Sequence, residues 1–209
     1  MTNKILALKY RPNDFKDLIG QEVMVETVTN AIKLGKTPNA YLLTGIRGVG
    51  KTTTARIVAK MLNCTVFDKN NNPDLINCEQ AKAITEDRHP DVIEIDAASN
   101  TSVENAREII ENVKYNPVLG KYKVYIVDEV HMLSKSAFNA LLKTLEEPPP
   151  HSKFIFATTE ISKVPITILS RCQRFDLRRV EKKTLSDFLK SIAKKENITI
   201  SNEALNLIV

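Results

Sequence analysis

Cysteine, long apolar runs and internal repeats are scarce or absent in this sequence of 209 residues. Its three cysteines, Cys64, Cys78 and Cys172, are too few for a disulfide framework. No apolar run approaches the roughly 20 residues that a membrane-spanning helix needs. Near the N-terminus, charged residues and a proline interrupt the chain before a signal-like apolar stretch develops. These absences exclude a disulfide-rich secreted protein and an integral membrane protein, so we expect a cytoplasmic location and no membrane contact.

The composition is typical of a globular protein, with 43% hydrophobic and 26% charged residues. The net charge of +5 permits contact with an anionic polymer such as nucleic acid, but a modest positive charge more often serves solubility. Basic residues are spread along the chain. The one dense run is typical of a solvated linker and comprises Arg178, Arg179, Lys182 and Lys183.

Short apolar runs alternate with segments of helical periodicity, which is typical of a parallel sheet covered by helices. The patterns predict strands at 41–43, 92–95, 124–127, 154–157 and 174–177, and helices at 51–63, 102–113 and 135–147. Ser134 is a suitable N-cap for the last helix, and the three prolines at 148–150 end it. We therefore expect an α/β fold with a parallel five-stranded sheet flanked by helices.

Two segments depart from this alternation. Residues 64–90, rich in Asn and Pro near 70–73, are interpreted as an inserted loop region. From about residue 180 the pattern is purely helical, with helices expected at 182–196 and 201–209. We expect a core domain at 1–179 and the start of a small helical domain at 180–209. Because the last helix stops without a cap at Val209, we interpret the chain as a fragment of a longer protein.

The strongest motif lies between the first strand and the first helix, where residues 45–52 fit G-x-x-x-x-G-K-[ST] in full. Glycines allow backbone N–H groups to surround phosphates, and the helix N-terminus adds partial positive charge. Lys51 can reach the β- and γ-phosphates during catalysis, and the Thr52 hydroxyl can bind Mg²⁺. The predicted nucleotide-binding residues are Gly45, Ile46, Arg47, Gly48, Val49, Gly50, Lys51, Thr52 and Thr53.

A second motif is the apolar run at 124–127, which ends in Asp128 and Glu129. Open α/β sheets bind ligands at the carboxyl ends of their strands. Asp128 is therefore a candidate for the Mg²⁺ shell, and Glu129 is the better candidate for polarising the attacking water. Alone, such a run indicates only the end of a strand. Together with the phosphate loop, it predicts a site that hydrolyses ATP.

Two weaker signals lie further along the chain. Thr158 and Thr159 follow the strand at 154–157. A hydroxyl there could contact the γ-phosphate or the attacking water. Without the other motifs, these two threonines would indicate a turn. Arg171 precedes the last strand, and the default interpretation of a single Arg is a surface salt bridge.

Several segments together resemble the clamp-loader branch of the AAA+ P-loop NTPases: residues 10–12 and 20–22, the phosphate loop, and residues 128–133, 140–148 and 170–172. The segment 94–99 narrows the resemblance to the N-terminal portion of the gamma/tau subunits of bacterial DNA polymerase III. The resemblance covers essentially the whole chain. It implies an ATPase that assembles with delta and delta-prime subunits and with further gamma/tau copies. It also implies that ATP binding opens the sliding clamp at primer–template DNA and that hydrolysis releases the clamp on the DNA.

The resemblance also implies roles for individual residues. Arg171 corresponds to an arginine finger that reaches the ATP of a neighbouring subunit. Thr159 corresponds to a sensor of the γ-phosphate. The family lines its adenine pocket at positions that correspond to Ala7, Arg11, Pro12 and Ile19. Residues 180–209 correspond to the beginning of a helical lid. A sensor arginine of that lid, and the collar domain that builds the assembly, are expected beyond Val209.

The chain departs from the family at its zinc module, which carries four cysteines. Cys64 and Cys78 remain, but Leu75 and Ala81 replace the other two. Two thiolates do not complete a tetrahedral zinc site. His89 is a candidate third ligand, although a single His is more often structural. We therefore expect no zinc.

Two other functions stay open at this stage. One is a structural clamp-loader subunit of the delta-prime kind, which keeps the arginine motif but does not hydrolyse ATP; Lys51, Asp128 and Glu129 argue against it. The other is a different AAA+ motor, such as a branch-migration helicase. The arginine motif at 170–172 and the turn at 146–148 favour the clamp loader.

Overall fold

The structure is a computed structural model that describes residues 5–99 and 103–209. Five parallel strands form one sheet in the order β2-β3-β4-β1-β5. The sheet confirms the expected α/β class and every predicted strand. The strands are β1 (Ala40–Thr44), β2 (Val92–Asp96), β3 (Lys123–Asp128), β4 (Ser152–Thr158) and β5 (Gln173–Asp176).

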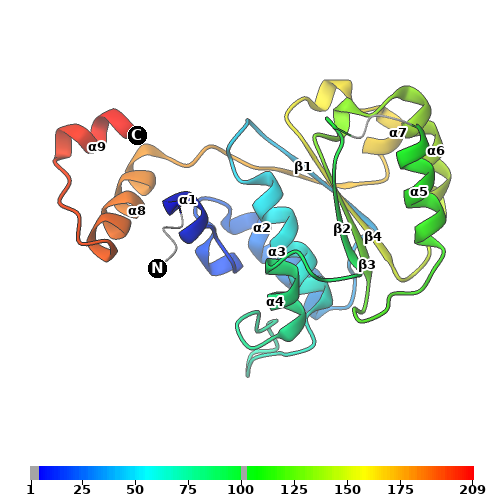
Figure 1. The fold of residues 1–209 in the computed structure, drawn as a ribbon, viewed down its shortest axis with the longest axis horizontal. Helices are drawn as coiled ribbons and strands as arrows, with labels where there is room; N and C mark the ends of the chain where they lie inside the picture. The colour runs from blue at the N-terminus through cyan, green and yellow to red at the C-terminus, as the bar shows by residue number, and fades with distance from the viewer. Residues whose placement is uncertain (1–4, 100–102) are drawn as a thin grey trace.

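Helices cover both faces of this sheet (Figure 1). One face carries α2 (Glu22–Lys33), α3 (Lys51–Asn63) and α4 (Glu79–Thr85). The other face carries α5 (Val103–Val113), α6 (Lys135–Glu146) and α7 (Ile166–Leu169). Short 3₁₀ helices are formed by Phe15–Asp17, Val130–Met132 and Ile161–Lys163. The predicted helix at 51–63 coincides with α3, and the predicted helix at 135–147 ends one residue later than α6.

The apolar core has two layers, one on each side of the sheet. Alternate residues of a central strand point to opposite layers: Tyr41 and Leu43 of β1 join the layer under α3, whereas Leu42 joins the layer under α5 and α6. All residues of β1 and β4 are buried, as expected of strands covered on both faces. The edge strands β2 and β5 are more exposed.

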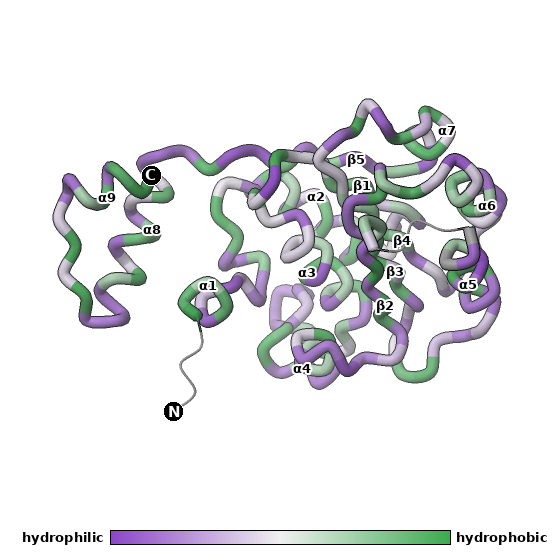
Figure 2. Tube along the Cα trace, turned by 45° about the horizontal axis from the view of Figure 1, so that its top comes forward, coloured by the Kyte–Doolittle hydropathy of each residue, from purple (hydrophilic) through white to green (hydrophobic). Residues whose placement is uncertain are grey.

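The last two helices lie apart from the sheet. An extended and mostly hydrophilic segment leads from β5 to α8 (Lys182–Lys195) and α9 (Asn202–Ile208) (Figures 1 and 2). Near the end of α8, Glu196 accepts a hydrogen bond of 2.6 Å from Lys9 Nζ and another from the Tyr10 hydroxyl. These contacts join this part of the chain to the short helix α1 (Leu6–Lys9). Within the described residues, no helix is long and apolar enough to cross a membrane.

The segment 64–90 is not a loop throughout, because it contains helix α4. Within α4 only two side chains, Ala81 and Ile84, are buried, so the apolar pattern of this helix is short and was missed. Cys64, Leu75, Cys78 and Ala81 all belong to the core layer under α3. The positions that the zinc module would use are therefore part of an apolar cluster.

Two of the candidate zinc ligands of this segment, Cys64 and His89, are engaged within the protein. The Cys64 thiol donates to the Val66 carbonyl at 3.1 Å, and burial raises the pKa of Cys64 to about 12, whereas zinc binds the thiolate. His89 is engaged on both ring nitrogens, by Gln80 Oε1 at 2.7 Å and by the Asp91 N–H at 3.1 Å. Across the part of the chain that the structure describes, no group of three or more potential ligands is found.

A buried polar residue, Asp91, holds the loop between α5 and β3. The Asp91 carboxylate is fully buried and accepts backbone N–H groups of Val118, Leu119 and Gly120, each at 2.7 Å. Burial alone would raise the pKa of Asp91, but these three hydrogen bonds to the charged form outweigh it and lower the pKa below its ordinary value of 3.8. The loop therefore depends on an ionised Asp91.

We predict that the purified protein contains no stoichiometric zinc. Metal analysis after dialysis should find far less than one zinc per chain. The double variant Leu75→Cys, Ala81→Cys, which restores four cysteines, should gain about one zinc per chain, because four thiolates complete a tetrahedral site. One zinc per chain in the parent protein would contradict this prediction.

We predict that Asp91→Asn destabilises the protein by about 1–3 kcal/mol at pH 7, because an amide NH₂ replaces an oxygen that accepts backbone N–H groups. The pKa of Asp91 is lowered by folding, so its contribution is present above the unfolded pKa and is lost as the pH falls. The difference between parent and variant in urea unfolding should therefore shrink below about pH 4. The exposed Asp187→Asn is the control. A difference that grows on acidification would refute the role of the carboxylate.

Candidate functional site

The carboxyl ends of three adjacent strands bring the predicted motifs together. Strand β1 lies beside β4, with Thr44 opposite Thr158. On the other side of β4 lies β3, which ends at Asp128. Because all three strands are parallel, the phosphate loop after β1, the carboxylates at the end of β3 and the threonines at the end of β4 emerge at one edge of the sheet.

The phosphate loop runs from Gly45 to Gly50 between β1 and α3. Gly45 has φ +150°, and a Cβ there would lie 2.8 Å from the Leu177 carbonyl oxygen, so no larger residue fits. Gly50 caps α3 in the left-handed region with φ +98°. Lys51 is only 6% exposed, and its ammonium donates to the carbonyls of Gly45 at 3.1 Å and Ile46 at 3.2 Å. A cation is thus held across the loop by carbonyl oxygens.

Thr52 and Asp128 are in contact, although 76 residues separate them. The Thr52 hydroxyl donates to Asp128 Oδ2, and the other oxygen, Oδ1, accepts the Glu129 N–H at 2.9 Å. A hydroxyl and a carboxylate are hard oxygen ligands of the kind that Mg²⁺ prefers. The two residues that the sequence proposes for magnesium therefore fit that ion.

Glu129 has an unusual backbone and a well-held side chain. Its φ of +46° places a non-glycine residue in the left-handed region, which costs about 1–2 kcal/mol. Its Oε2 accepts the Thr159 backbone N–H at 3.1 Å and the Thr159 hydroxyl at 2.9 Å. His131 Nδ1 lies 3.3 Å from the same oxygen. The strained backbone thus directs the carboxylate toward the end of β4.

A groove of about 910 Å³ runs over these residues. Of the predicted site residues, it is lined by Arg11, Ile46, Arg47, Gly48, Gly50, Lys51, Thr52, Thr53, Asp128, Glu129 and Thr159. Asp96, Ala98, His131 and Met132 also line it and were not predicted. A nucleotide-sized groove thus collects the phosphate loop, both carboxylates and Thr159 in one place.

A second pocket, of about 650 Å³, adjoins the groove and shares Arg11, Gly48, Gly50 and Thr53 with it. Arg11 Nε donates to Thr53 Oγ1 at 3.0 Å and so lies at the junction. All four residues proposed for the adenine pocket line the second pocket, together with Val49. Its other wall was not predicted and comes from α8 and the segment before it, through Val180, Phe188, Leu189 and Ile192.

Arg171 does not join either pocket of its own chain. It follows α7, and its guanidinium donates to Glu146 Oε1 at 2.6 Å and to the Thr167 carbonyl at 2.6 Å. The side chain is partly exposed, at 32%. The structure therefore separates Arg171 from the groove, whereas it brings the other predicted residues to the groove, to its loop or to the second pocket.

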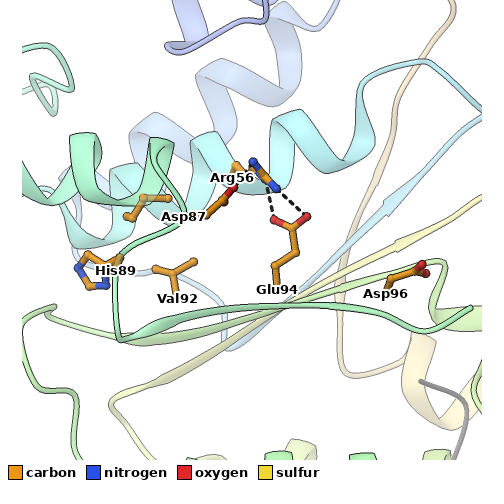
Figure 3. A pocket seen from close by; sticks show the side chains of 7 residues that line it. Arg56, Asp87, His89, Val92, Glu94 and Asp96 are labelled. Atoms are coloured by element: carbon orange, nitrogen blue, oxygen red, sulfur yellow. Dashed lines mark hydrogen bonds and ion pairs between the residues drawn. The ribbon is translucent and has the colours of Figure 1, made fainter. Parts of the chain in front are cut away.

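A smaller cavity of about 410 Å³ lies beside the edge strand β2 (Figure 3). Arg56 donates to both oxygens of Glu94, at 2.6 and 3.0 Å, and lies 3.3 Å from Asp87 (Figure 3). The charges of this cavity are thus paired within the protein. It contains none of the predicted site residues, and we do not consider it the functional site.

The residues that were missed have identifiable signals. Asp96 directly follows the apolar run of β2 and lies opposite Asp128 in the register of the sheet, so it could have been found as a second strand-end carboxylate. His131 lies two residues after Glu129. The α8 side chains could not have been found, because their place beside the phosphate loop depends on how distant segments pack.

A family model described as DNA polymerase III, delta subunit, matches residues 20–181, a range that includes the phosphate loop, both carboxylates and Arg171. The chain belongs to this family.

Several curated relatives are similar over essentially the whole chain. The chain is 49% identical over 98% of its length to DNA polymerase III subunit tau/gamma of Haemophilus influenzae, and covers 30% of that protein. It is 49% identical over 100% of its length to subunit gamma of Buchnera aphidicola subsp. Schizaphis graminum, and covers 57% of it. The chain is 47% identical over 100% of its length to subunit tau of Escherichia coli, and covers 32% of that protein. The chain thus spans about a third to somewhat over half of these relatives, and the resemblance to gamma/tau subunits is confirmed.

Solved structures share the fold. A gamma subunit-related DNA polymerase III protein of Thermotoga maritima aligns with a TM-score of 0.54 and 23% identity, over 81% of this chain and 51% of that one. The RuvB Holliday junction branch migration motor of the same organism aligns with a TM-score of 0.65 and 20% identity, over 94% and 58%. The fold is therefore that of the AAA+ P-loop ATPases.

We predict that Lys51→Ala abolishes or strongly weakens binding of ATP, because it removes a cation held at the phosphate loop. Binding of a fluorescent ATP analogue, measured by titration, should be lost, whereas the exposed Lys36→Ala should bind as the parent does. Equal affinity of parent and Lys51→Ala would contradict the assignment of the loop.

Proposed function

We propose that this chain is the ATP-binding and ATP-hydrolysing module of a replicative clamp-loader subunit of the gamma/tau kind, within a DNA polymerase III holoenzyme. The supporting observation is the convergence of Lys51, Thr52, Asp128 and Glu129 on one groove, in a chain 47–49% identical to tau and gamma subunits. In this role the protein opens a sliding clamp and loads it onto primed DNA. A cytoplasmic location follows from the replication role.

The phosphates of ATP are bound by the loop between β1 and α3. Its backbone N–H groups and the N-terminus of α3 favour negative charge. Lys51, which donates to two loop carbonyls in the structure, turns its ammonium to the β- and γ-phosphates. Thr52 and Asp128 would hold a Mg²⁺ ion, which would neutralise charge on the phosphates. The hydrogen bond between these two side chains supports their joint role.

Glu129 orients and polarises the water that attacks the γ-phosphate, and Thr159 senses that phosphate. The contact between Glu129 Oε2 and the Thr159 hydroxyl, at 2.9 Å, supports a functional coupling of the two residues. Both side chains line the groove beside Lys51. The two groups therefore act on the same end of the triphosphate.

The adenine ring occupies the pocket between α1 and α8. Ala7, Pro12 and Ile19 supply apolar contacts on one side, and Phe188 and Leu189 supply them on the other. We divide the chain into an ATPase core at 1–179 and the first part of a helical lid at 180–209. The location of α8 and α9 beyond the extended segment supports this division (Figure 1).

Arg171 acts on a neighbouring subunit as an arginine finger. Its position outside both pockets, on a partly exposed surface, supports a role toward another chain. The partners proposed for the assembly are delta, delta-prime and further gamma/tau copies, together with the sliding clamp and primer–template DNA. A non-hydrolysing subunit is disfavoured by the complete set of Lys51, Asp128 and Glu129.

The proposal is tested with the full-length protein assembled with its partner subunits. ATP turnover should rise when sliding clamp and primed DNA are added, and clamps should appear on the DNA. Glu129→Gln should keep ATP binding but slow hydrolysis, because the amide keeps the shape and loses the charge. Asp128→Asn should instead raise the Mg²⁺ requirement. An assembly that hydrolyses no ATP under any of these conditions would overturn the proposal.

We predict that Arg171→Ala leaves ATP affinity of the isolated chain unchanged but slows hydrolysis in the assembly. Arginine fingers contribute about 10³–10⁵ in rate in well-studied cases. We expect a smaller loss here, because assembly and DNA steps limit turnover. Mixing Arg171→Ala subunits with Lys51→Ala subunits should recover activity wherever an intact finger meets an intact phosphate loop. Weakened ATP binding by monomeric Arg171→Ala would show that the residue acts within its own chain.

A further inference from the structure

The side chain of His131 is buried at the functional site. The proposed steps of ATP hydrolysis give this residue no role. It lies in the 3₁₀ helix Val130–Met132, directly after Glu129, and its side chain is only 5% exposed. Its Nδ1 lies 2.9 Å from Thr158 Oγ1 and 3.3 Å from Glu129 Oε2. On the opposite side of the ring, Nε2 lies 3.4 Å from Glu160 Oε1. The imidazole thus lies between the Glu129 carboxylate and the end of β4.

The neighbours of the ring determine where its proton lies. An ionised carboxylate can only accept, so a hydrogen bond between the ring and Glu129 Oε2 requires the proton to be on Nδ1. Thr158 Oγ1 already accepts the Glu160 N–H at 3.0 Å and can accept from Nδ1 as well. Glu160 is itself paired with Lys163 at 2.8 Å, which restrains the carboxylate facing Nε2. The ring is therefore held on both sides, with Nδ1 hydrogen-bonded to Thr158 Oγ1 and 3.3 Å from Glu129 Oε2.

Binding of ATP changes the contacts of Glu129. In the structure, Oε2 accepts hydrogen bonds from the Thr159 hydroxyl and the Thr159 backbone N–H, and His131 Nδ1 lies 3.3 Å from it. A threonine hydroxyl has a single proton. When Thr159 donates that proton to the γ-phosphate, it can no longer donate to Glu129. The carboxylate then keeps only the backbone N–H and the imidazole at the moment when it must orient water.

We propose that His131 is a positioning residue that holds the Glu129 carboxylate in place once the Thr159 hydroxyl has turned to the γ-phosphate. Nδ1 supplies the hydrogen bond to Glu129, and the contacts of the ring with Thr158 and Glu160 fix its orientation. His131 touches neither phosphate nor water. This inference rests on the proposed ATPase function and assigns to His131 the coupling between the phosphate sensor and the catalytic carboxylate.

The test compares three variants in the full-length protein assembled with its partners, sliding clamp and primed DNA. His131→Ala removes both ring nitrogens. His131→Asn places an amide near the position of Nδ1, and His131→Gln places one near the position of Nε2. We expect His131→Ala to lower kcat for ATP about 10- to 100-fold, as losses of positioning groups do, with Kd for ATP and thermal stability close to the parent. The His131→Asn variant should recover most of the parent kcat, whereas His131→Gln should not.

A second readout separates positioning from general structural support. In a Glu129→Gln background, His131→Ala should cause no further loss in single-turnover hydrolysis, because it acts through Glu129. His151, a histidine outside the groove that contacts the Val113 carbonyl at 2.9 Å, supplies the matched control, and His151→Ala should keep the parent kcat.

The outcomes are distinguishable. If His131→Ala keeps the parent kcat, or loses ATP affinity and stability together with kcat, the positioning role is overturned while the ATPase assignment stands. An additional loss in the Glu129→Gln background would likewise overturn it. An assembly in which even the parent hydrolyses no ATP would instead overturn the proposed function itself.

Discussion

The parallel register of β1, β4 and β3 is the constraint on which the candidate site depends. Thr44 lies opposite Thr158, and β3 ends at Asp128 on the far side of β4, so the segments that follow these strands leave the sheet side by side. If the pairing of a buried strand shifted by one residue, each of its side chains would move to the opposite face of the sheet. Side chains of the layer under α3 would then lie under α5 and α6, and the reverse. The continuous burial of β1 and β4 opposes such a shift. The core thus determines the distance between the phosphate loop and the carboxylates.

Local strain is the second element of the site. Gly45 and Gly50 adopt backbone conformations that suit glycine, so the loop can approach Leu177 closely and enter α3 abruptly. Glu129 adopts a left-handed conformation without being glycine. Its carboxylate contacts with Thr159 and His131 offset that cost. At the site, this strain therefore falls on Glu129, the residue whose orientation the proposed chemistry needs.

Much of this arrangement could be predicted from the sequence, because the strands and the phosphate loop each have a recognisable residue pattern within a short segment. The apolar runs identified all five strands, and the glycine-lysine motif identified the loop before α3. Helix α4 was missed because it has only seven residues and buries little beyond Ala81 and Ile84. Asp96 and His131 lie beside strand ends that the sequence does indicate, but their meeting in one groove depends on which strands are neighbours. The α8 wall of the second pocket depends on packing between segments far apart in the chain, which one sequence does not reveal.

The second pocket connects nucleotide binding to the position of the last two helices. Lys9 forms an ion pair with Glu196 at the surface, and Tyr10 donates to the same carboxylate; a surface ion pair is weakened by salt and contributes little. The apolar side chains of α1 and α8 face the same pocket from opposite sides. An adenine ring between them would bury apolar surface on both and so add a stronger contact than the ion pair supplies. Binding of the adenine base would then favour one arrangement of α8 relative to the sheet. The γ-phosphate of the same ATP would withdraw the Thr159 hydroxyl from Glu129. The two ends of a single nucleotide would thus act on two separate parts of the protein, α8 and the Glu129 carboxylate.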